Sequence, residues 1–252
     1  MSSHCNIAFV QGASQGIGLA FVQKLLTDDR YDTVFASARH PENAVPLTRL
    51  SEQFADRLTL LPLDVTDEKT IAAAASQLAN NATQLSLLIN CSGLLHTDSM
   101  LPEKRLSEVS LANLDASFRV NAFGPLLVAK HFSPLMSRTE RCVIANLSAR
   151  VASLEDNRLG GWHAYRGSKA ALNMFTKNLA IELARKHHSI ICAALHPGTV
   201  DTNLSRPFQR NVPAEKLFDS AQAAAQLLVV IDSLTPTDNG GFFAWDGERI
   251  PW

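Results

Sequence analysis

Short apolar runs alternate with helical patterns along the whole 252-residue chain, and this alternation limits the possible folds more than any other feature. In these runs most positions are aliphatic or aromatic, so both faces of each strand are expected to be buried. Such strands, separated by helices, are typical of a parallel sheet with helices on either side. The strands are predicted at residues 7–10, 33–38, 58–63, 85–89, 142–147, 189–195 and 241–244. The predicted fold class is therefore α/β, a doubly wound parallel sheet with helices on both faces.

Helices are predicted between these strands from apolar spacing and from capping side chains. Asp67 is well placed to cap the alanine-rich helix that runs to about residue 80, and a long helical region is interrupted near Gly124-Pro125. The other helical patterns lie at residues 17–27, at 107–136, around residue 165 as far as about 186, and at 220–233. Because the chain has no linker, internal repeat or low-complexity segment, we expect one domain spanning residues 1–252.

The charge balance gives no reason to expect nucleic acid or an anionic membrane as a partner, because the formal net charge is −1. No apolar run reaches the roughly 18 residues of a membrane-spanning helix, and the N-terminus lacks the layout of a signal peptide. Cys5, Cys91, Cys142 and Cys192 are widely spaced and lie in or beside apolar runs. Free thiols are therefore expected rather than disulfides or a metal site, which indicates a reducing compartment and a cytoplasmic protein.

A glycine-rich loop follows the first predicted strand, with the spacing G-x-x-x-G-x-G at Gly12, Gly16 and Gly18. Glycine permits a tight turn there and a close backbone approach, and the following helix offers free N–H groups to a pyrophosphate. With the parallel sheet, this loop predicts a Rossmann-type dinucleotide-binding fold. The same letters match the G-x-S-x-G elbow of serine hydrolases, with Ser14 as nucleophile and His196 as a nominal base. That elbow follows a central strand rather than the first one, so the hydrolase is the weaker interpretation.

The end of the second predicted strand indicates which nicotinamide cofactor would bind. An acidic residue about twenty positions after the glycines would hold the ribose 2′-hydroxyl of NAD, but this chain has Ala38-Arg39 there. A guanidinium suits the 2′-phosphate of NADP, through a charge-assisted contact worth about 1.5–3 kcal/mol. We therefore expect NADP, although Gln15 stands where a basic residue would strengthen that preference.

Tyr165 and Lys169 are four residues apart on a predicted helix, so both side chains project from the same face. A phenol beside an ammonium loses its proton more readily than a free phenol, which is useful for proton transfer to or from a substrate. Taken alone, a Tyr–Lys pair at this spacing is more often a solvated surface pair. Its meaning depends on the surrounding motifs.

The glycine loop, an asparagine at a strand end and the Y-x-x-x-K spacing together resemble the short-chain dehydrogenase/reductase family over essentially the whole chain. The family's N-N-A-G motif is similar to Asn90-Cys91-Ser92-Gly93, and its P-G turn after the sixth strand is similar to Pro197-Gly198. Residues 160–169, 195–198 and 246–252 look most like the C-factor and sniffer-type carbonyl reductase branch.

The resemblance implies a catalytic group built on Tyr165, Lys169 and Asn121. In the family the tyrosine protonates a carbonyl oxygen as hydride arrives. The lysine lowers the tyrosine's pKa and holds the nicotinamide ribose. The asparagine keeps its helix kinked and holds a relay water. Asp64 matches the acid that contacts adenine, and Thr202 the threonine that reaches the nicotinamide amide. The resemblance implies that the cofactor lies against Gly12, Ser14, Gln15, Gly16, Ile17, Gly18, Arg39, Asp64, Val65, Asn90, Cys91, Ser92, Gly93, Tyr165, Lys169, Pro197, Gly198, Val200 and Thr202.

The chain departs from the family at the fourth catalytic position. The family's fifth strand usually ends in two serines, the second of which bonds the substrate oxygen, whereas this chain reads Asn146-Leu-Ser-Ala149. Ala149 falls at the serine's position and Ser148 one residue before it, and adjacent strand residues face opposite sides. Ser148 is a catalytic candidate only if the strand ends or bulges there, and we favour Ala149 as the equivalent position. Arg150 is expected at the surface, although it would favour an anionic substrate if it faced the cleft.

We expect an NADP(H)-dependent oxidoreductase that transfers hydride to a small carbonyl substrate and forms a homo-oligomer, either a dimer or a tetramer. The alternative is a cofactor-binding signalling or regulatory protein of the C-factor type with little turnover. Residues 199–218 are candidates for a substrate lid, and His96 and His163 for the pocket wall. Four aromatic residues are expected in the core or at an oligomer contact: Phe242, Phe243, Trp245 and Trp252.

Overall fold

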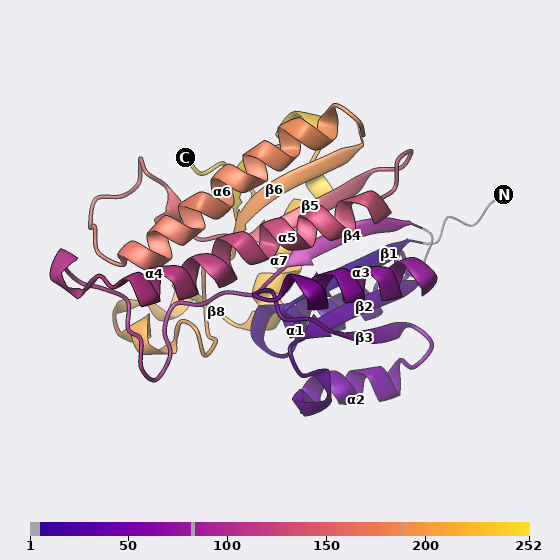
Figure 1. The fold of residues 1–252 in the computed structure, drawn as a ribbon, viewed down its shortest axis with the longest axis horizontal. Helices are drawn as coiled ribbons and strands as arrows, with labels where there is room; N and C mark the ends of the chain where they lie inside the picture. The colour runs from indigo at the N-terminus through magenta and orange to yellow at the C-terminus, as the bar shows by residue number, and fades with distance from the viewer. Residues whose placement is uncertain (1–5, 82–83, 188) are drawn as a thin grey trace.

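The computed structural model describes residues 6–81, 84–187 and 189–252, and its centre is a seven-stranded parallel sheet (Figure 1). The sheet is made of β1 (Ile7–Gln11), β2 (Thr33–Ala38), β3 (Leu58–Pro62), β4 (Leu85–Asn90), β5 (Cys142–Leu147), β6 (Ile190–His196) and β9 (Gly241–Ala244). Two short strands, β7 (Thr199–Val200) and β8 (Leu217–Phe218), pair with each other outside this sheet. The order β3-β2-β1-β4-β5-β6-β9 reverses direction between β1 and β4, where ligands bind in such sheets. The predicted Rossmann-type doubly wound sheet is confirmed.

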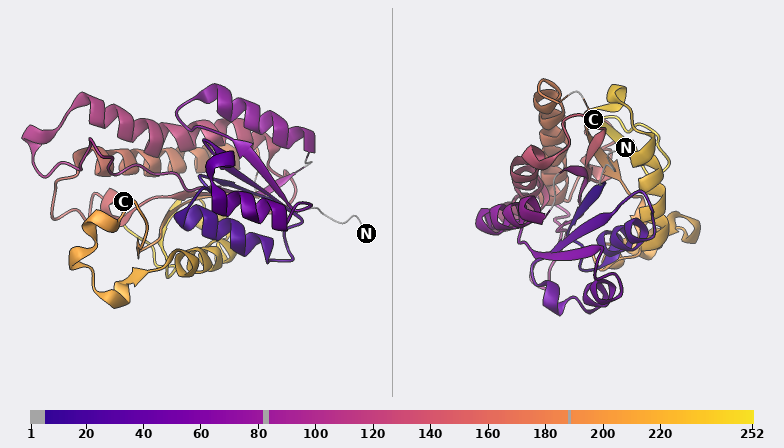
Figure 2. Two further views of the ribbon diagram at one scale, coloured as in Figure 1. Left: turned by 90° about the horizontal axis from the view of Figure 1, so that it is seen from below. Right: turned by 90° about the vertical axis from the view of Figure 1, so that its right-hand side faces the viewer.

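Helices cover both faces of the sheet (Figures 1 and 2). They are α1 (Gly16–Leu26), α2 (Val45–Gln53), α3 (Glu68–Asn81), α4 (Leu111–Phe118), α5 (Gly124–Phe132), α6 (His163–Ala184) and α7 (Ser220–Ser233). Residues of α3, α5 and α6 share one core with Phe9 of β1, whereas residues of α1, α2 and α7 share the other core with Val10. The sheet therefore separates two apolar cores.

Alternate residues of a central strand enter different cores, which explains the continuous apolar runs in the sequence. In β5, Ile144 packs in the core of α5 and α6, while Val143 and Ala145 pack in the core of α1 and α7. Every residue of β5 is buried. Burying a large aliphatic side chain contributes about 1.5–3 kcal/mol, so both faces of the strand favour apolar residues.

The helices differ from the sequence prediction in two places. α2 forms where no helix is predicted, with proline in its first turn, and it buries only Leu47. The interruption expected near Gly124-Pro125 is a five-residue π-helix, Arg119–Phe123, that ends directly before Gly124, and the sequence does not indicate this form. Pro125 is the second residue of α5 and follows the π-helix without a gap, so its missing N–H falls where the regular helical bonding is already interrupted. The predicted cap of α3 is confirmed, because Asp67 Oδ1 accepts from Lys69 N at 3.0 Å.

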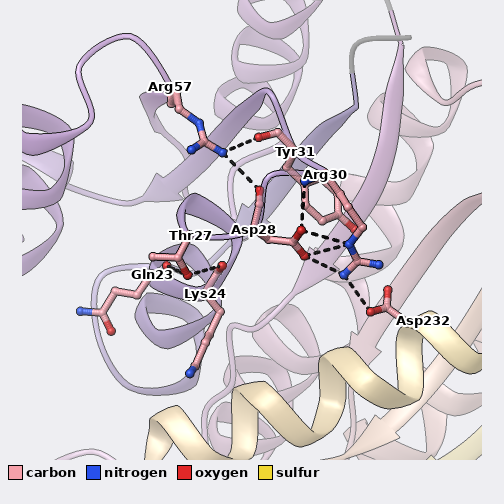
Figure 3. A network of polar contacts seen from close by, with 8 residues as sticks. All are labelled: Gln23, Lys24, Thr27, Asp28, Arg30, Tyr31, Arg57 and Asp232. Atoms are coloured by element: carbon pink, nitrogen blue, oxygen red, sulfur yellow. Dashed lines mark hydrogen bonds and ion pairs between the residues drawn. The ribbon is translucent and has the colours of Figure 1, made fainter. Parts of the chain in front are cut away.

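A polar network joins α1, α7 and the loop before β3 at the end of α1 that lies away from the glycine loop (Figure 3). Arg30 Nη2 lies 2.6 Å from Asp28 Oδ2 and 2.9 Å from Asp232 Oδ2. Arg57 Nη2 donates to Tyr31 O at 2.6 Å. The Arg30 side chain is 56 % exposed, so its ion pairs contribute little to stability.

The C-terminal aromatic residues divide between the core and the surface. Phe242 and Phe243 are buried in β9, and Trp245 packs partly buried against the same region. Trp252 is 38 % exposed and stacks on Phe242, with the ring centroids 5.6 Å apart. Core packing therefore accounts for the two phenylalanines.

The described cysteines, Cys91, Cys142 and Cys192, are all free thiols, as expected. Cys5 and the N-terminal residues considered for a signal peptide lie outside the described residues. Across residues 6–81, 84–187 and 189–252, no helix is long and apolar enough to cross a membrane, and no three His, Cys, Asp or Glu side chains gather as metal ligands would.

Candidate active site

The glycine loop between β1 and α1 has the backbone shape that its spacing predicts. Gly12 has φ 81° and Gly16 has φ 58°, which are left-handed conformations that favour glycine. A Cβ on Gly12 would lie 2.8 Å from Ser92 N, and a Cβ on Gly18 would lie 2.2 Å from Gly12 O. α1, which the structure describes in full, has no side-chain cap and no acidic residue in its first turn. Its free N–H groups and helix dipole therefore suit an anion.

The carboxyl end of β2 lies against this loop. Ser37 O accepts hydrogen bonds from Gly12 N at 3.1 Å and from Ala13 N at 2.8 Å. Arg39, two residues further on, is exposed, and among the described residues its guanidinium has no ion-pair or hydrogen-bond partner. This guanidinium is available to a phosphate group near the loop, as the sequence predicts.

Polar residues after β3 and β4 brace the loops beside the glycine loop. Asp64 Oδ1 accepts from Thr66 N at 2.8 Å and from Thr66 Oγ1 at 2.7 Å. Val65 is buried beside it. After β4, Ser92 Oγ donates to Gln11 Oε1 at 2.8 Å. The strand ends named in the sequence analysis therefore meet at one edge of the sheet.

A buried polar ladder links β4 and β5 to α6. Asn90 Nδ2 donates to Asn146 Oδ1 at 2.7 Å, and Asn146 Nδ2 donates to Thr176 Oγ1 at 2.8 Å. Nearer the end of β5, Ser148 Oγ donates to Asn173 Oδ1 at 2.7 Å. Buried polar groups need such partners, and these bonds fix α6 against the strand ends.

Ala149 is the more open of the two residues that follow β5. Ser148 is 4 % exposed, whereas Ala149 is half-buried. Among the described residues no hydrogen bond joins Ser148 to Tyr165, so the geometry does not favour Ser148 as the catalytic hydroxyl. It supports the expectation that Ala149 occupies the family's serine position. Arg150 is exposed and pairs with Asp156 at 3.0 Å, as a surface arginine does.

Asn121 lies in the π-helix and joins the loop after β4 to α6. Its Oδ1 accepts from Leu94 N at 2.7 Å, and its Nδ2 donates to Leu94 O at 2.8 Å and to Ser168 Oγ at 3.0 Å. Ser168 Oγ donates in turn to Tyr165 O at 2.9 Å. The Asn121 side chain thereby connects the helix of Tyr165 to the end of β4.

Tyr165 and Lys169 are both buried on α6, one helical turn apart, at 8 % and 3 % exposure. Lys169 Nζ donates to Leu147 O at 2.7 Å, and burial lowers the pKa of Lys169 to about 8. Burial raises the pKa of Tyr165 to about 12. The lowering of the tyrosine's pKa expected from the lysine is therefore not found, because loss of hydration dominates. A Cβ on Gly93 would lie 3.8 Å from Lys169 Nζ, so this glycine borders the ammonium.

The turn after β6 brings the last predicted cofactor residues to the glycine loop. Gly198 follows Pro197 with φ 77°, again a conformation that favours glycine. Val200 is buried in β7. Thr202 Cγ2 lies 3.3 Å from the place of a Cβ on Gly16. These residues therefore border the same edge as β1 and β4.

The segment after β7 lies in the position expected of a substrate lid. Asn203 Nδ2 donates to Gln15 Oε1 at 3.0 Å, and Asn203 O lies 3.0 Å from His96 Nε2. The ring of Phe208 packs 5.7 Å from His96 and 5.0 Å from Trp162 between centroids. The segment thus contacts both the glycine loop and Trp162, whose ring packs on Tyr165.

Ser14 and His196 do not form a hydrolase pair. Within the described chain no hydrogen bond joins Ser14 to a histidine, and Ser14 lies in the turn before α1. His196 ends β6 with Nδ1 buried and unpartnered, and loss of hydration lowers its pKa to about 4. A base of that pKa is a poor proton acceptor for a serine hydroxyl at neutral pH.

Three residues that shape the site are not singled out by the sequence. Asn173 lies four residues after Lys169 on the same helix face, and this spacing indicates a side chain near the Tyr165–Lys169 pair. Phe208 lies in an irregular stretch, where no periodicity indicates which side chains point inward. Glu103 is buried against the start of α6, far from that helix in the sequence, so no local pattern reveals it.

Comparison with known proteins identifies the family. Residues 6–213 match the family model for short chain dehydrogenase. The C-signal protein of Myxococcus xanthus is 35 % identical over 147 residues, which cover 58 % of this chain and 83 % of that one. The NADPH-bound carbonyl reductase from chicken fatty liver superposes with a TM-score of 0.88 at 30 % identity, covering 99 % of this chain and 100 % of that one. The carbonyl reductase Sniffer of D. melanogaster superposes with a TM-score of 0.87 at 26 % identity and the same coverage. The chain therefore belongs to the short-chain dehydrogenase family of oxidoreductases, and its resemblance to the C-factor and sniffer-type carbonyl reductases is confirmed.

Proposed function

We propose that this chain is an NADP(H)-dependent reductase of small carbonyl compounds. The observation that carries the proposal is the Tyr165–Lys169 pair, buried one turn apart at the sheet edge that holds the glycine loop. The phenol of Tyr165 carries a proton that it can donate, and the Lys169 ammonium one turn away can stabilise the phenolate that remains. The similar carbonyl reductase from chicken fatty liver is described with NADPH bound.

The residues at this edge fit a nicotinamide dinucleotide phosphate. The absence of a Cβ at Gly12 and Gly18 lets the loop pack closely on the backbone of Ser92 and lets α1 begin directly against the loop, and the first turn of α1 offers its N–H groups to a phosphate. Arg39 would hold the 2′-phosphate, Asp64 the adenine and Lys169 the nicotinamide ribose. When bound, the cofactor supplies the hydride that reduces the carbonyl carbon.

The side chains of this chain would move and hold the proton. Tyr165 Oη would donate it to the substrate oxygen, which contributes roughly 10²–10⁴ in rate for a well-placed acid. Lys169, already held by Leu147 O, would stabilise the phenolate that remains. Asn121 holds Ser168 and the loop after β4, which keeps α6 in place. We propose that it also holds the relay water of the family.

A second function, cofactor-dependent signalling with little turnover, has a specific observation in its favour. Ala149 offers no hydroxyl to a substrate oxygen, and the hydroxyl of Ser148 is already bonded to Asn173. The similarity to the C-signal protein points the same way. If this function is correct, NADPH binds but carbonyl turnover does not depend on Tyr165.

Tyr165→Phe separates the two functions, because it removes the proton donor and keeps the ring. We expect the Kd for NADPH, measured by fluorescence titration, to stay nearly unchanged while reduction of a panel of aldehydes, ketones and quinones falls roughly 10²-fold or more. Lys169→Ala should weaken both binding and turnover. Equal rates in wild type and Tyr165→Phe would place the activity elsewhere, and NADPH binding without turnover in either would favour signalling.

We also propose that the protein is a cytoplasmic dimer or tetramer. Two exposed apolar side chains on α6 support an association: Met174 is 60 % exposed and Ile181 is 49 % exposed. They lie seven residues apart and therefore on one helix face. Light scattering of the purified protein measures the oligomeric state directly.

A further inference from the structure

Glu103 is a buried carboxylate beside the candidate active site that has no role in the reaction described above. It lies between β4 and α4 and is 2 % exposed. Its Oε2 accepts from Ala164 N at 3.2 Å, and its backbone O accepts from Trp162 N at 2.5 Å. Its Oε1 is buried and has no partner among the described residues. Both bonds are made to the start of α6, the helix that carries Tyr165.

The start of α6 lacks a cap of its own. Trp162 is the N-cap residue, and its side chain makes no capping bond, whereas serine, threonine or aspartate there would cap the helix locally. Gly160, Gly161 and Trp162 all have left-handed backbone, with φ 63°, 66° and 51°. Within the described residues Trp162 is the one non-glycine residue with positive φ. A bulky side chain in that conformation is strained, so other contacts must hold it there.

The strained backbone places the indole of Trp162 against the catalytic tyrosine. The Trp162 and Tyr165 rings meet edge to face, with centroids 6.2 Å apart. The other side of the indole meets Phe208 at 5.0 Å. Gly161 approaches the same support, because a Cβ there would lie 3.3 Å from Glu103 O. Glu103 therefore contacts Trp162 and Ala164 and borders Gly161.

We propose that Glu103 is a positioning residue for Tyr165. It caps α6 from 61 positions away in the sequence, which frees position 162 for a tryptophan that packs on the tyrosine ring. The open N–H groups and positive dipole end of a helix favour a carboxylate oxygen at this place. The bond to Ala164, the residue before Tyr165, fixes the first turn of the helix. The proposal rests on the proposed function, because the position of Tyr165 matters to turnover only if it donates the proton.

Three substitutions separate the capping oxygen from the charge. Glu103→Gln keeps an oxygen that can accept from Ala164 N, Glu103→Ala removes it, and Glu103→Asp keeps the charge but withdraws the oxygen by one methylene. We expect kcat to fall about tenfold to a hundredfold in the alanine and aspartate variants, as for a misplaced catalytic group. Glu103→Gln should stay within about threefold of wild type, and the Kd for NADPH should change little in all three.

Amide hydrogen exchange of residues 160–168 gives a readout that needs no turnover. The amides of the first turn should stay protected in wild type and Glu103→Gln and exchange faster in Glu103→Ala and Glu103→Asp. Asp67→Ala is the matched control, because it removes the bond from Lys69 N at the start of α3. It should change neither kcat nor exchange at α6.

The outcomes distinguish this proposal from the proposed function. Equal kcat in wild type and Glu103→Ala, or a loss in Glu103→Gln as large as in Glu103→Ala, overturns the positioning role. Absence of Tyr165-dependent turnover in the wild type overturns the proposed function instead, and hydrogen exchange then decides whether Glu103 caps α6. If Glu103→Ala does not fold, the comparison of the glutamine and aspartate variants decides.

Discussion

Among single residues, the pair that follows β5 distinguishes this chain most clearly from the pattern of its family. Ser148 Oγ donates to Asn173 Oδ1, and the side chain is buried. We propose that Ala149 stands where the family places a hydroxyl that bonds the substrate oxygen. A hydrogen bond to a developing oxyanion is typically worth about 10²–10³ in rate. We therefore expect the wild-type protein to reduce generic carbonyls slowly although its cofactor site is complete.

Ala149→Ser should raise kcat tenfold or more, because it adds one hydroxyl at little steric cost in a half-buried position. The Kd for NADPH should be almost unchanged, since the substitution lies on the substrate side. Steady-state kinetics on one aldehyde and one quinone, beside a binding titration, measure both quantities.

Ser148→Ala is the matched control for that gain. It leaves Asn173 Oδ1 without its donor, so it should lower the free energy of unfolding by about 1–3 kcal/mol while changing kcat little. The reverse pattern, a crippled Ser148→Ala and no benefit from Ala149→Ser, would assign the catalytic hydroxyl to Ser148.

Among the secondary-structure elements, the carboxyl end of β2 is where we propose that the cofactor preference is set. Arg39 is exposed beside the glycine loop, and its guanidinium is unpaired in the described structure. We expect NADPH to bind at least about tenfold more tightly than NADH, and Arg39→Ala to erase most of this difference. Titration of both cofactors into both proteins measures it.

Arg138→Ala is a suitable control for that substitution. Arg138 is also exposed but precedes β5 at the opposite edge of the sheet, so its loss changes the net charge equally without touching the loop. Equal Kd values for NADPH and NADH in the wild type would contradict the role assigned to Arg39.

The elements also show how far the sequence predicts this structure. Most strands are predictable because both of their faces are buried, which leaves apolar runs. The exception is β3 at the edge of the sheet, which exposes Thr59 and Pro62. α2 is not, because it has only nine residues and buries only Leu47, so few apolar positions mark it in the sequence. The glycine loop is predictable because its constraints are local. The bonds from Ser148 to Asn173 and from Glu103 to Ala164 join residues 25 and 61 positions apart, and no local pattern records such partners.

For the molecule as a whole, burying the Lys169 ammonium in the site lowers the free energy of unfolding by an amount that depends on pH. Burial lowers the pKa of Lys169 from 10.5 to about 8. Between those values the unfolded chain holds the proton that the folded chain has released, so stability rises with pH through this window. Below pH 8 the full cost of burying the ammonium remains.

Lys169→Met should therefore stabilise the protein at pH 7 while abolishing activity. The gain from removing the buried charge exceeds the loss of the bond to Leu147 O, by about 1–2 kcal/mol. Thermal melts should show a Tm about 2–8 °C higher than wild type at pH 7, with the difference shrinking toward pH 10. Lys177→Met, at an exposed position on the same helix, should show no such pH dependence. A less stable Lys169→Met at pH 7 would show that the bond outweighs the desolvation.

One seven-stranded sheet includes strands from β1, near the start of the chain, to β9, near its end. A large apolar core covers each face of this sheet. A single domain over residues 1–252 stays a prediction that this arrangement supports.

The reversal of strand order between β1 and β4 has a consequence for protein engineering. Residues on the β2 side would recognise the adenosine half of the cofactor, and residues on the β5 side would handle the reacting groups. A library aimed at cofactor preference and a library aimed at substrate range can therefore be built on separate segments and combined afterwards. The two halves touch where a Cβ on Gly12 would lie 2.8 Å from Ser92 N. That glycine is the position both libraries should leave unchanged.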